Sequence, residues 1–210
     1  KFTMTSANDL STMSYSNTYT IDSSILTGTF PVQWKPDGSK LFIANQSGDE
    51  KIYQWPVSSA FNPSSSGFNP SLGTSSNYDL TSDTGTNEWG DISTSYYRDP
   101  VGLIFKSDGT KMFVGDRAEE AIYEYSLSTA WDVTTASYTD RLVTSSVDNQ
   151  MNTFTMKADG TRLYHCDSSD IHEWSLSTAW DISTASFSQT HSNVRAGGGY
   201  LNGLNFSSDG

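Results

Sequence analysis

The stretch GLIFKSDGTKMFV, residues 102–114, decides the fold, because it places an Asp-Gly pair between two apolar runs. Asp-Gly flanked in this way is the strongest short-range signal of a β-hairpin. The same pair recurs along the chain, starting at positions 37, 108, 159 and 209. The chain therefore repeats a unit of about 50 residues, and the wider first interval indicates one long insertion.

Each unit carries signals for four strands. The run before Asp-Gly alternates, with apolar residues such as Leu103 and Phe105 on one face. The run after it is apolar at nearly every position, as expected of a strand covered on both faces. A third run reads IYQWPV from residue 52, IYEYSL from residue 122 and IHEWSL from residue 171. The segment STAWD, or a similar segment in the other units, comes next. Its Asp is expected to cap a turn. An aromatic residue then starts a weaker fourth strand. These aromatic residues are Tyr15, Phe68, Tyr138 and Phe187.

Four short strands in a unit of about 50 residues are the pattern of a propeller blade. The string GLIFKSDGTKMFV…IYEYSL resembles the repeat of β-propeller proteins of the WD-repeat, TolB-like and lactonase-like kinds. Its Ser-Thr-Ala-Trp-Asp variant resembles large repeat proteins of marine bacteria and phages. The Gly-His pair of true WD repeats is absent, and no lactonase metal ligand matches residue by residue. We therefore expect an all-β fold, a β-propeller with four-stranded antiparallel blades.

The repeat also predicts the domain organisation. Residues 1–210 are expected to form a segment of one β-propeller domain that belongs to a larger ring, because closed rings usually have four to eight blades. The expected units are 1–28 (partial), 29–99 (with an insertion at 69–98), 100–149, 150–199 and 200–210 (partial).

The composition excludes some classes of binding partner. The formal net charge is −12, with only 12 Lys and Arg residues. Binding to nucleic acid needs a basic face that neutralises phosphates, so this class is excluded. No apolar run approaches the roughly 20 residues that span a bilayer. The richness in Ser, Thr, Asn, Gly and aromatic residues favours an extracellular protein or a virion surface. The single Cys166 is expected to be a small buried residue.

The insertion is the strongest departure from the repeat. It carries Tyr78, Trp89, Tyr96 and Tyr97 among Asp and Asn residues. In a propeller, this connection lies on the same face as the loop between the second and third strands. The four aromatic side chains are candidates for a platform that stacks on a sugar or contacts a protein. The alternative is a loop whose aromatic residues pack onto the blades, since loop insertions cost little.

A second candidate site is the column Asn45, Asp116 and Asp167, directly after the second strand of each unit. Oxygen ligands in this position could hold Ca²⁺; otherwise no cofactor is expected. The alternative is that Asn and Asp simply begin turns. The three histidines do not form a metal site by spacing. Two of them lie on adjacent strands and could approach each other, but a zinc site needs three or four ligands.

These observations favour a non-enzymatic extracellular or virion β-propeller for structure or recognition. Its partners would be a protein or glycan surface, with a homo-oligomer or larger assembly as a further expectation. No catalytic residue is assigned. The alternative is a propeller hydrolase, lactonase-like or glycosidase-like, with a Ca²⁺-dependent site on the loop face. The regular columns argue against it, because catalytic rings concentrate unlike acidic and His residues at the channel mouth.

Overall fold

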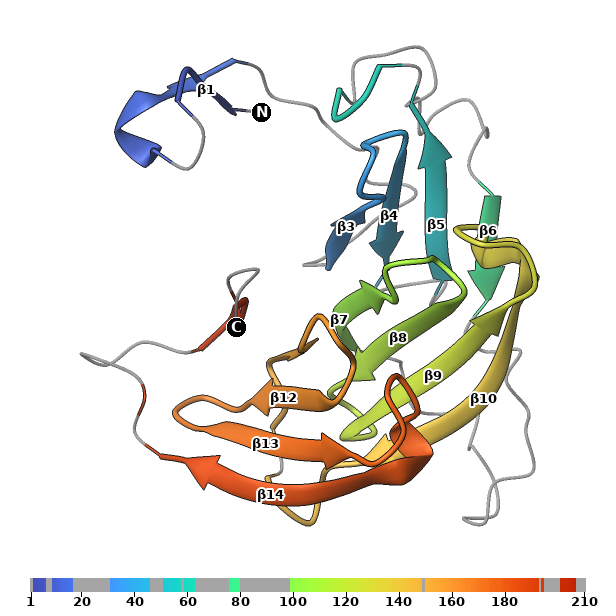
Figure 1. The fold of residues 1–210 in the computed structure, drawn as a ribbon, viewed down its shortest axis with the longest axis vertical. Helices are drawn as coiled ribbons and strands as arrows, with labels where there is room; N and C mark the ends of the chain where they lie inside the picture. The colour runs from blue at the N-terminus through green and yellow to red at the C-terminus, as the bar shows by residue number, and fades with distance from the viewer. Residues whose placement is uncertain are drawn as a thin grey trace.

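The computed structural model describes residues 2–6, 9–16, 31–45, 51–57, 59–62, 76–79, 99–148, 150–192, 194 and 201–206. These residues form three four-stranded antiparallel sheets and a two-stranded hairpin, with three short 3-10 turns. The sheets follow one another as blades, with β3 and β7 on the inner side and β6, β10 and β14 on the outer side (Figure 1). The predicted all-β propeller fold with four-stranded blades is confirmed, and the described residues do not close a ring.

The strands of each blade are in sequence order across the sheet. The first blade contains β3 (Val32–Trp34), β4 (Lys40–Ala44), β5 (Lys51–Pro56) and β6 (Ser76–Asp79). The second contains β7 (Pro100–Phe105), β8 (Lys111–Asp116), β9 (Ala121–Leu127) and β10 (Ala136–Val143). The third contains β11 (Thr153–Met156), β12 (Arg162–Cys166), β13 (Ile171–Leu176) and β14 (Ala185–His191). The hairpin at the N-terminus pairs β1 (Phe2–Met4) with β2 (Met13–Tyr15).

The fourth strand of the first blade differs in position from the sequence expectation. Phe68, the residue expected to start it, lies outside the described residues, and the described strand that pairs with β5 is Ser76–Asp79. Tyr78 pairs with Ile52 there, as Leu142 pairs with Ile122 in the second blade. Part of the predicted insertion is therefore strand, because the outer edge of β5 needs backbone partners.

The core lies between neighbouring blades. One cluster joins Phe42 and Ile52 of the first blade to Leu103, Met112 and Tyr125 of the second. A second cluster joins Phe113 and Ile122 to the apolar residues of the third blade in the same way. Successive residues of β8 are thus buried against opposite neighbours, which explains why the second strand of each unit is apolar at nearly every position.

The Ser-Thr-Ala-Trp-Asp segment closes each blade with a fixed geometry. Trp131 has a φ of 63° and donates its backbone N–H to the carbonyl of Gly109 (3.0 Å). Asp132 then caps the 3-10 turn η4 (Val133–Thr135) by accepting from the N–H of Thr134. The third blade repeats this arrangement at Trp180 and at η5 (Ile182–Thr184), where Asp181 is the cap. The predicted capping role of these aspartates is confirmed.

The hydrogen bonds within the Asp-Gly turns predict that the fold loses stability as the pH falls. Asp108 accepts from Lys106 Nζ (2.7 Å) and from the hydroxyl and backbone N–H of Thr110 (2.6 and 2.9 Å). The Lys106 contact, followed by the Thr110 contacts, lowers the pKa of this carboxyl from 3.8 to about 2. A carboxyl with a lowered pKa in the folded state stabilises the fold above its ordinary pKa, and this contribution is lost as the pH falls through the folded value.

We therefore expect the melting temperature to fall between pH 4 and pH 2, in part through Asp108. In Asp108→Asn, whose side chain does not titrate, the fall in this range should be smaller. An NMR titration of the side-chain carboxyl carbons measures the pKa directly. A midpoint for Asp108 near 3.8 would contradict the expectation.

No helix in the described part of the chain has the length and apolar character needed to cross a membrane.

Candidate functional site

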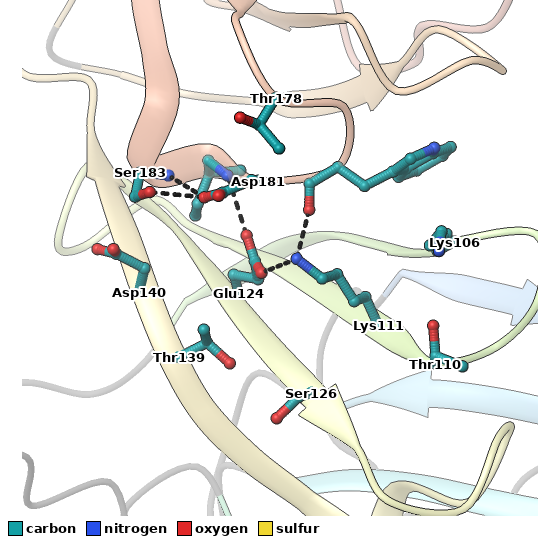
Figure 2. Close-up of polar contacts among 12 residues, drawn as sticks. Lys106, Thr110, Lys111, Glu124, Ser126, Thr139, Asp140, Thr178, Asp181 and Ser183 are labelled. Atoms are coloured by element: carbon teal, nitrogen blue, oxygen red, sulfur yellow. Dashed lines mark hydrogen bonds and ion pairs between the residues drawn. The ribbon is translucent and has the colours of Figure 1, made fainter.

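At both junctions between the three described blades, a polar contact holds the closing turn of the following blade. At the junction of the second and third blades, Lys111 Nζ donates to Glu124 Oε1 (2.5 Å) and to the carbonyl of Trp180 (2.7 Å). Glu124 Oε2 accepts from the backbone N–H of Ile182 (2.9 Å). Figure 2 shows these side chains reaching from the second blade to the turn of the third. Glu124 is only 1% exposed, so this carboxylate serves the junction and is closed to solvent.

The first junction repeats the contact with an amide in place of the carboxylate. Lys40 Nζ donates to the carbonyl of Trp131 (2.6 Å) and to Gln54 Oε1 (3.1 Å). The same Gln54 oxygen accepts from the N–H of Val133 (3.1 Å), and Gln54 Nε2 donates to Asp132 Oδ1 (2.7 Å). A neutral amide and a carboxylate thus perform one structural task at equivalent positions.

The third blade has Arg162 and Glu173 at these positions. Glu173 is paired with Arg162 (2.5 Å) and accepts from Gln189 (2.9 Å), and His191 Nε2 lies 3.2 Å from it. The contact with Gln189, followed by those with His191 and Arg162, lowers the pKa of Glu173 although burial opposes the shift. All these partners come from the third blade itself.

The structure shows how two residues of the predicted Ca²⁺ column are used. Asp116 Oδ1 accepts from the backbone N–H groups of Ala118 (2.9 Å) and Glu119 (3.3 Å). Asp167 Oδ1 accepts from those of Ser169 and Asp170, both at 2.7 Å. Both carboxylates therefore begin turns, which is the alternative role. Asn45 is buried directly after β4. Binding of Ca²⁺ by this column stays a prediction.

Of the four aromatic residues proposed as the platform, the structure describes only one. Tyr78 lies in β6, in the outer strand of the first blade. Trp89, Tyr96 and Tyr97 lie outside the described residues. The predicted stacking platform therefore stays a prediction.

A cluster that spacing did not predict lies at one end of the third blade. His165 on β12 and His172 on β13 are cross-strand partners, and their rings stack with centroids 4.7 Å apart. Asp148, from the connection between β10 and β11, places Oδ2 2.6 Å from His165 Nε2 and 3.6 Å from His172 Nε2. Across the described residues, this is the one group of three His, Cys, Asp or Glu side chains whose ligand atoms converge within 4.8 Å.

The hydrogen bonds of His165 assign its tautomer. The indole Nε1–H of Trp174 donates to His165 Nδ1 (2.9 Å), which must therefore be unprotonated. The proton of the neutral ring is on Nε2, from which it is donated to Asp148 Oδ2. His165 is fully buried, and this burial lowers the pKa of the imidazole despite the opposing effect of Asp148.

Asp148 is held as an anion. Burial acts to raise the pKa of this carboxyl, but the hydrogen bonds from His165 and from the backbone N–H of Gln150 (2.8 Å) lower it overall. Nearby, burial and the charge of Asp148 raise the pKa of Glu120. This end of the blade therefore concentrates negative charge beside two imidazole rings.

The histidines were visible in the sequence as departures from the repeat. His165 replaces Ile43 and Val114, and His172 replaces Tyr53 and Tyr123, in columns that are otherwise apolar or aromatic. Substitutions at two positions that face each other across one hairpin are the signal that could have identified the pair. Asp148 gave no such signal, since it comes from a connection of variable length.

Comparison with known proteins supports the fold. No family model matches the chain, and no curated protein matches it. Among solved structures, candidate 6-phosphogluconolactonases from Bacteroides uniformis and Bacteroides fragilis match with TM-scores of 0.51 and 0.52, each at 13% identity over 86% of this chain and 45% of theirs. The β-propeller domain of Cps50 (Swd1) from Myceliophteria thermophila matches with a TM-score of 0.44, at 12% identity over 72% of this chain and 42% of that one. The chain thus spans less than half the length of these structures, and its likeness to the two Bacteroides structures concerns the fold alone.

Proposed function

We propose that this chain is a non-enzymatic β-propeller module for structure or recognition, acting outside the cell or on a virion surface. The observation that supports it is the use of its acidic and amide side chains. Glu124 and Gln54 hold blade junctions, while Asp132 and Asp181 cap turns. Groups committed to internal hydrogen bonds are not available for acid-base chemistry on a substrate.

The recognition surface in this proposal is the loop face with the insertion. Trp89, Tyr96 and Tyr97 are the proposed contacts to a glycan or protein, together with Tyr78 of β6, because aromatic side chains supply large contact areas with a polar edge. The column Asn45, Asp116 and Asp167 is the proposed Ca²⁺ site on the same face. A homo-oligomer or larger assembly is compatible with this role.

A propeller hydrolase is the second candidate. The observation that favours it is that the matching solved structures include candidate 6-phosphogluconolactonases. The short contact between Asp148 and His165 has the form of an acid-base pair. However, His165 is fully buried and its second nitrogen is occupied by Trp174, so that a substrate has no access to this ring in the described conformation.

A glycan and protein-surface array tests the proposal. We expect binding by the chain and a loss of at least about tenfold in affinity, roughly 1.4 kcal/mol, in Trp89→Ala and Tyr97→Ala. Tyr15→Ala, which removes an exposed aromatic side chain outside the insertion, should bind like the parent. Equal binding by all three variants would reject the aromatic platform.

The hydrolase alternative needs its own measurement. The assay measures the rate at which acid is released from δ-gluconolactone and from its 6-phosphate in the presence of the protein. This rate is compared with the spontaneous rate of hydrolysis in buffer alone. We expect no rate above that background, with or without Ca²⁺. A turnover that disappears in His165→Val would instead establish the hydrolase.

A further inference from the structure

The sequence contains one Asn-Gly pair, Asn202-Gly203, and the structure leaves both residues exposed. The pair lies in the segment 201–206, which reads LNGLNF. A Cβ built at Gly203 finds nothing within 4 Å. Within the described part of the chain, the N–H of Gly203 makes no hydrogen bond. The backbone nitrogen next to the Asn202 side chain is therefore sterically open.

The corresponding glycine of the second blade lies in a different setting. Gly102 in GLIFKSDG holds the position that Gly203 holds in GLNFSSDG. Gly102 is buried, and a Cβ at this position would lie 2.4 Å from Phe154 Cδ1 on the third blade. Packing of the third blade thus encloses Gly102, whereas Gly203 stays open to solvent.

An Asn side chain beside such a glycine can react with the backbone. The nitrogen of Gly203 attacks Asn202 Cγ, so that a C–N bond forms and the Cγ–Nδ2 bond breaks. The proton of the Gly203 N–H passes to the leaving group, which departs as ammonia and leaves a cyclic succinimide. Water then opens the ring at either carbonyl carbon and gives aspartate or isoaspartate. Glycine favours the attack because no Cβ obstructs its nitrogen, and the reacting groups are held close together.

The three described Asp-Gly turns hold the equivalent groups in place. The N–H of Gly109 donates to the carbonyl of Lys106 (2.8 Å), and Asp108 Oδ1 accepts a backbone N–H within the turn. The lowered pKa of Asp108 keeps the carboxyl ionised, and a carboxylate is a poor electrophile. The turns at Asp37 and Asp159 make the same contacts. These turns therefore resist the reaction to which Asn202 is open.

We propose that Asn202 is a site of spontaneous deamidation, in which the nitrogen of Gly203 is the nucleophile and water completes the conversion to aspartate and isoaspartate. The reaction needs no reagent other than water. It adds one carboxylate to a chain whose formal net charge is already −12. The proposal goes beyond the proposed recognition function and does not depend on it.

The modification would act on the contact between this segment and the third blade. The carbonyl of Leu201 accepts from Cys166 Sγ (3.6 Å), and the ring of Phe206 lies 4.7 Å from that of Tyr164 on β12. Asn202 lies between these two anchors. An isoaspartyl residue inserts an additional carbon atom into the backbone there, so both anchors can no longer keep their places. We therefore expect isoaspartate to loosen the segment and to uncover Cys166, which is 1% exposed.

Incubation of the folded chain in mildly alkaline buffer, followed by proteolysis and mass spectrometry, tests the proposal. We expect the peptide with Asn202 to convert before any other Asn peptide, and isoaspartyl methyltransferase to methylate the product. Gly203→Ala should slow the conversion at least about tenfold, because the added Cβ hinders the nitrogen. This variant has room for the Cβ and should fold like the parent.

Labelling of Cys166 with a maleimide measures the effect on the fold. The converted chain can be separated from the parent by ion exchange, because it carries the additional negative charge. We expect its thiol to react several times faster than that of the fresh parent. Gly203→Ala, incubated for the same time, should react like the fresh parent.

Four outcomes would contradict the proposal. An intact Asn202 after incubation would exclude the modification, and equal conversion in Gly203→Ala would exclude attack by the Gly203 nitrogen. Conversion at Asp108-Gly109 as fast as at Asn202 would show that the hydrogen bonds of the turn give no protection. Unchanged labelling of Cys166 in the isoaspartyl form would exclude the loosening of the segment.

Discussion

Glu124→Ala should lower the free energy of unfolding by roughly 2–4 kcal/mol, because it leaves buried partners without their acceptor. The carboxylate accepts from Lys111 Nζ on its own blade and from the backbone N–H of Ile182 on the next. Without it, that N–H is unpaired at the blade junction, and a cavity replaces a side chain that is 1% exposed. Chemical denaturation followed by tryptophan fluorescence measures the difference.

Glu124→Gln is the matched control. Gln54 makes the equivalent contacts with Lys40 and Val133 at the first junction, so the amide is known to fit this geometry. We expect Glu124→Gln to cost about 1 kcal/mol or less, since the hydrogen bonds remain and only the charge is lost. A loss as large as that of Glu124→Ala would show that the charge of Glu124, rather than its acceptor geometry, holds the junction.

Gly160→Ala should be destabilising by roughly 2–5 kcal/mol, through backbone strain and a steric clash together. Gly160 has a φ of 74°, and a Cβ at this position would lie 2.2 Å from Trp180 Cδ1. The Trp180 ring cannot move away freely, because its backbone N–H donates to the carbonyl of Gly160 (3.0 Å). Thermal and denaturant unfolding measure the loss.

Two further variants separate the causes of this loss. Gly203→Ala should be nearly neutral, because nothing lies within 4 Å of a Cβ built there. In the background of Trp180→Ala, the Gly160→Ala change should cost only the backbone strain, about 1–2 kcal/mol. An undiminished cost in that background would exclude the clash with the ring as a cause.

Much of the fold could be predicted because its signals are local. The Asp-Gly turns join strands that are neighbours in sequence, and the apolar runs of β8 and β12 indicate burial on both faces. The fourth strand of the first blade was less predictable. Its pairing with β5 involves Ser76–Asp79, beyond the aromatic residue that marks this strand in the other units. The insertion separates the two partners, so spacing from the turn no longer determines the register.

The candidate site could be predicted less well than the fold. The sequence identified His165 and His172 as residues on adjacent strands, and it predicted Asp167 as a Ca²⁺ ligand, which stays a prediction. It gave no sign of the carboxylate beside them, because Asp148 reaches the pair from the connection that precedes the blade. Only tertiary packing brings this loop against the β12–β13 hairpin.

The sequence alone determined the repeating antiparallel blades, because turn chemistry and strand alternation act between residues close in the chain. The tertiary structure decided which polar side chains meet. Lys111 contacts Trp180, and Lys40 contacts Trp131, across 69 and 91 residues respectively. Contacts over such separations depend on how one blade packs against the next. Glu124 and His172 become buried only through that packing, and burial is what makes the loss of a hydrogen-bond partner costly.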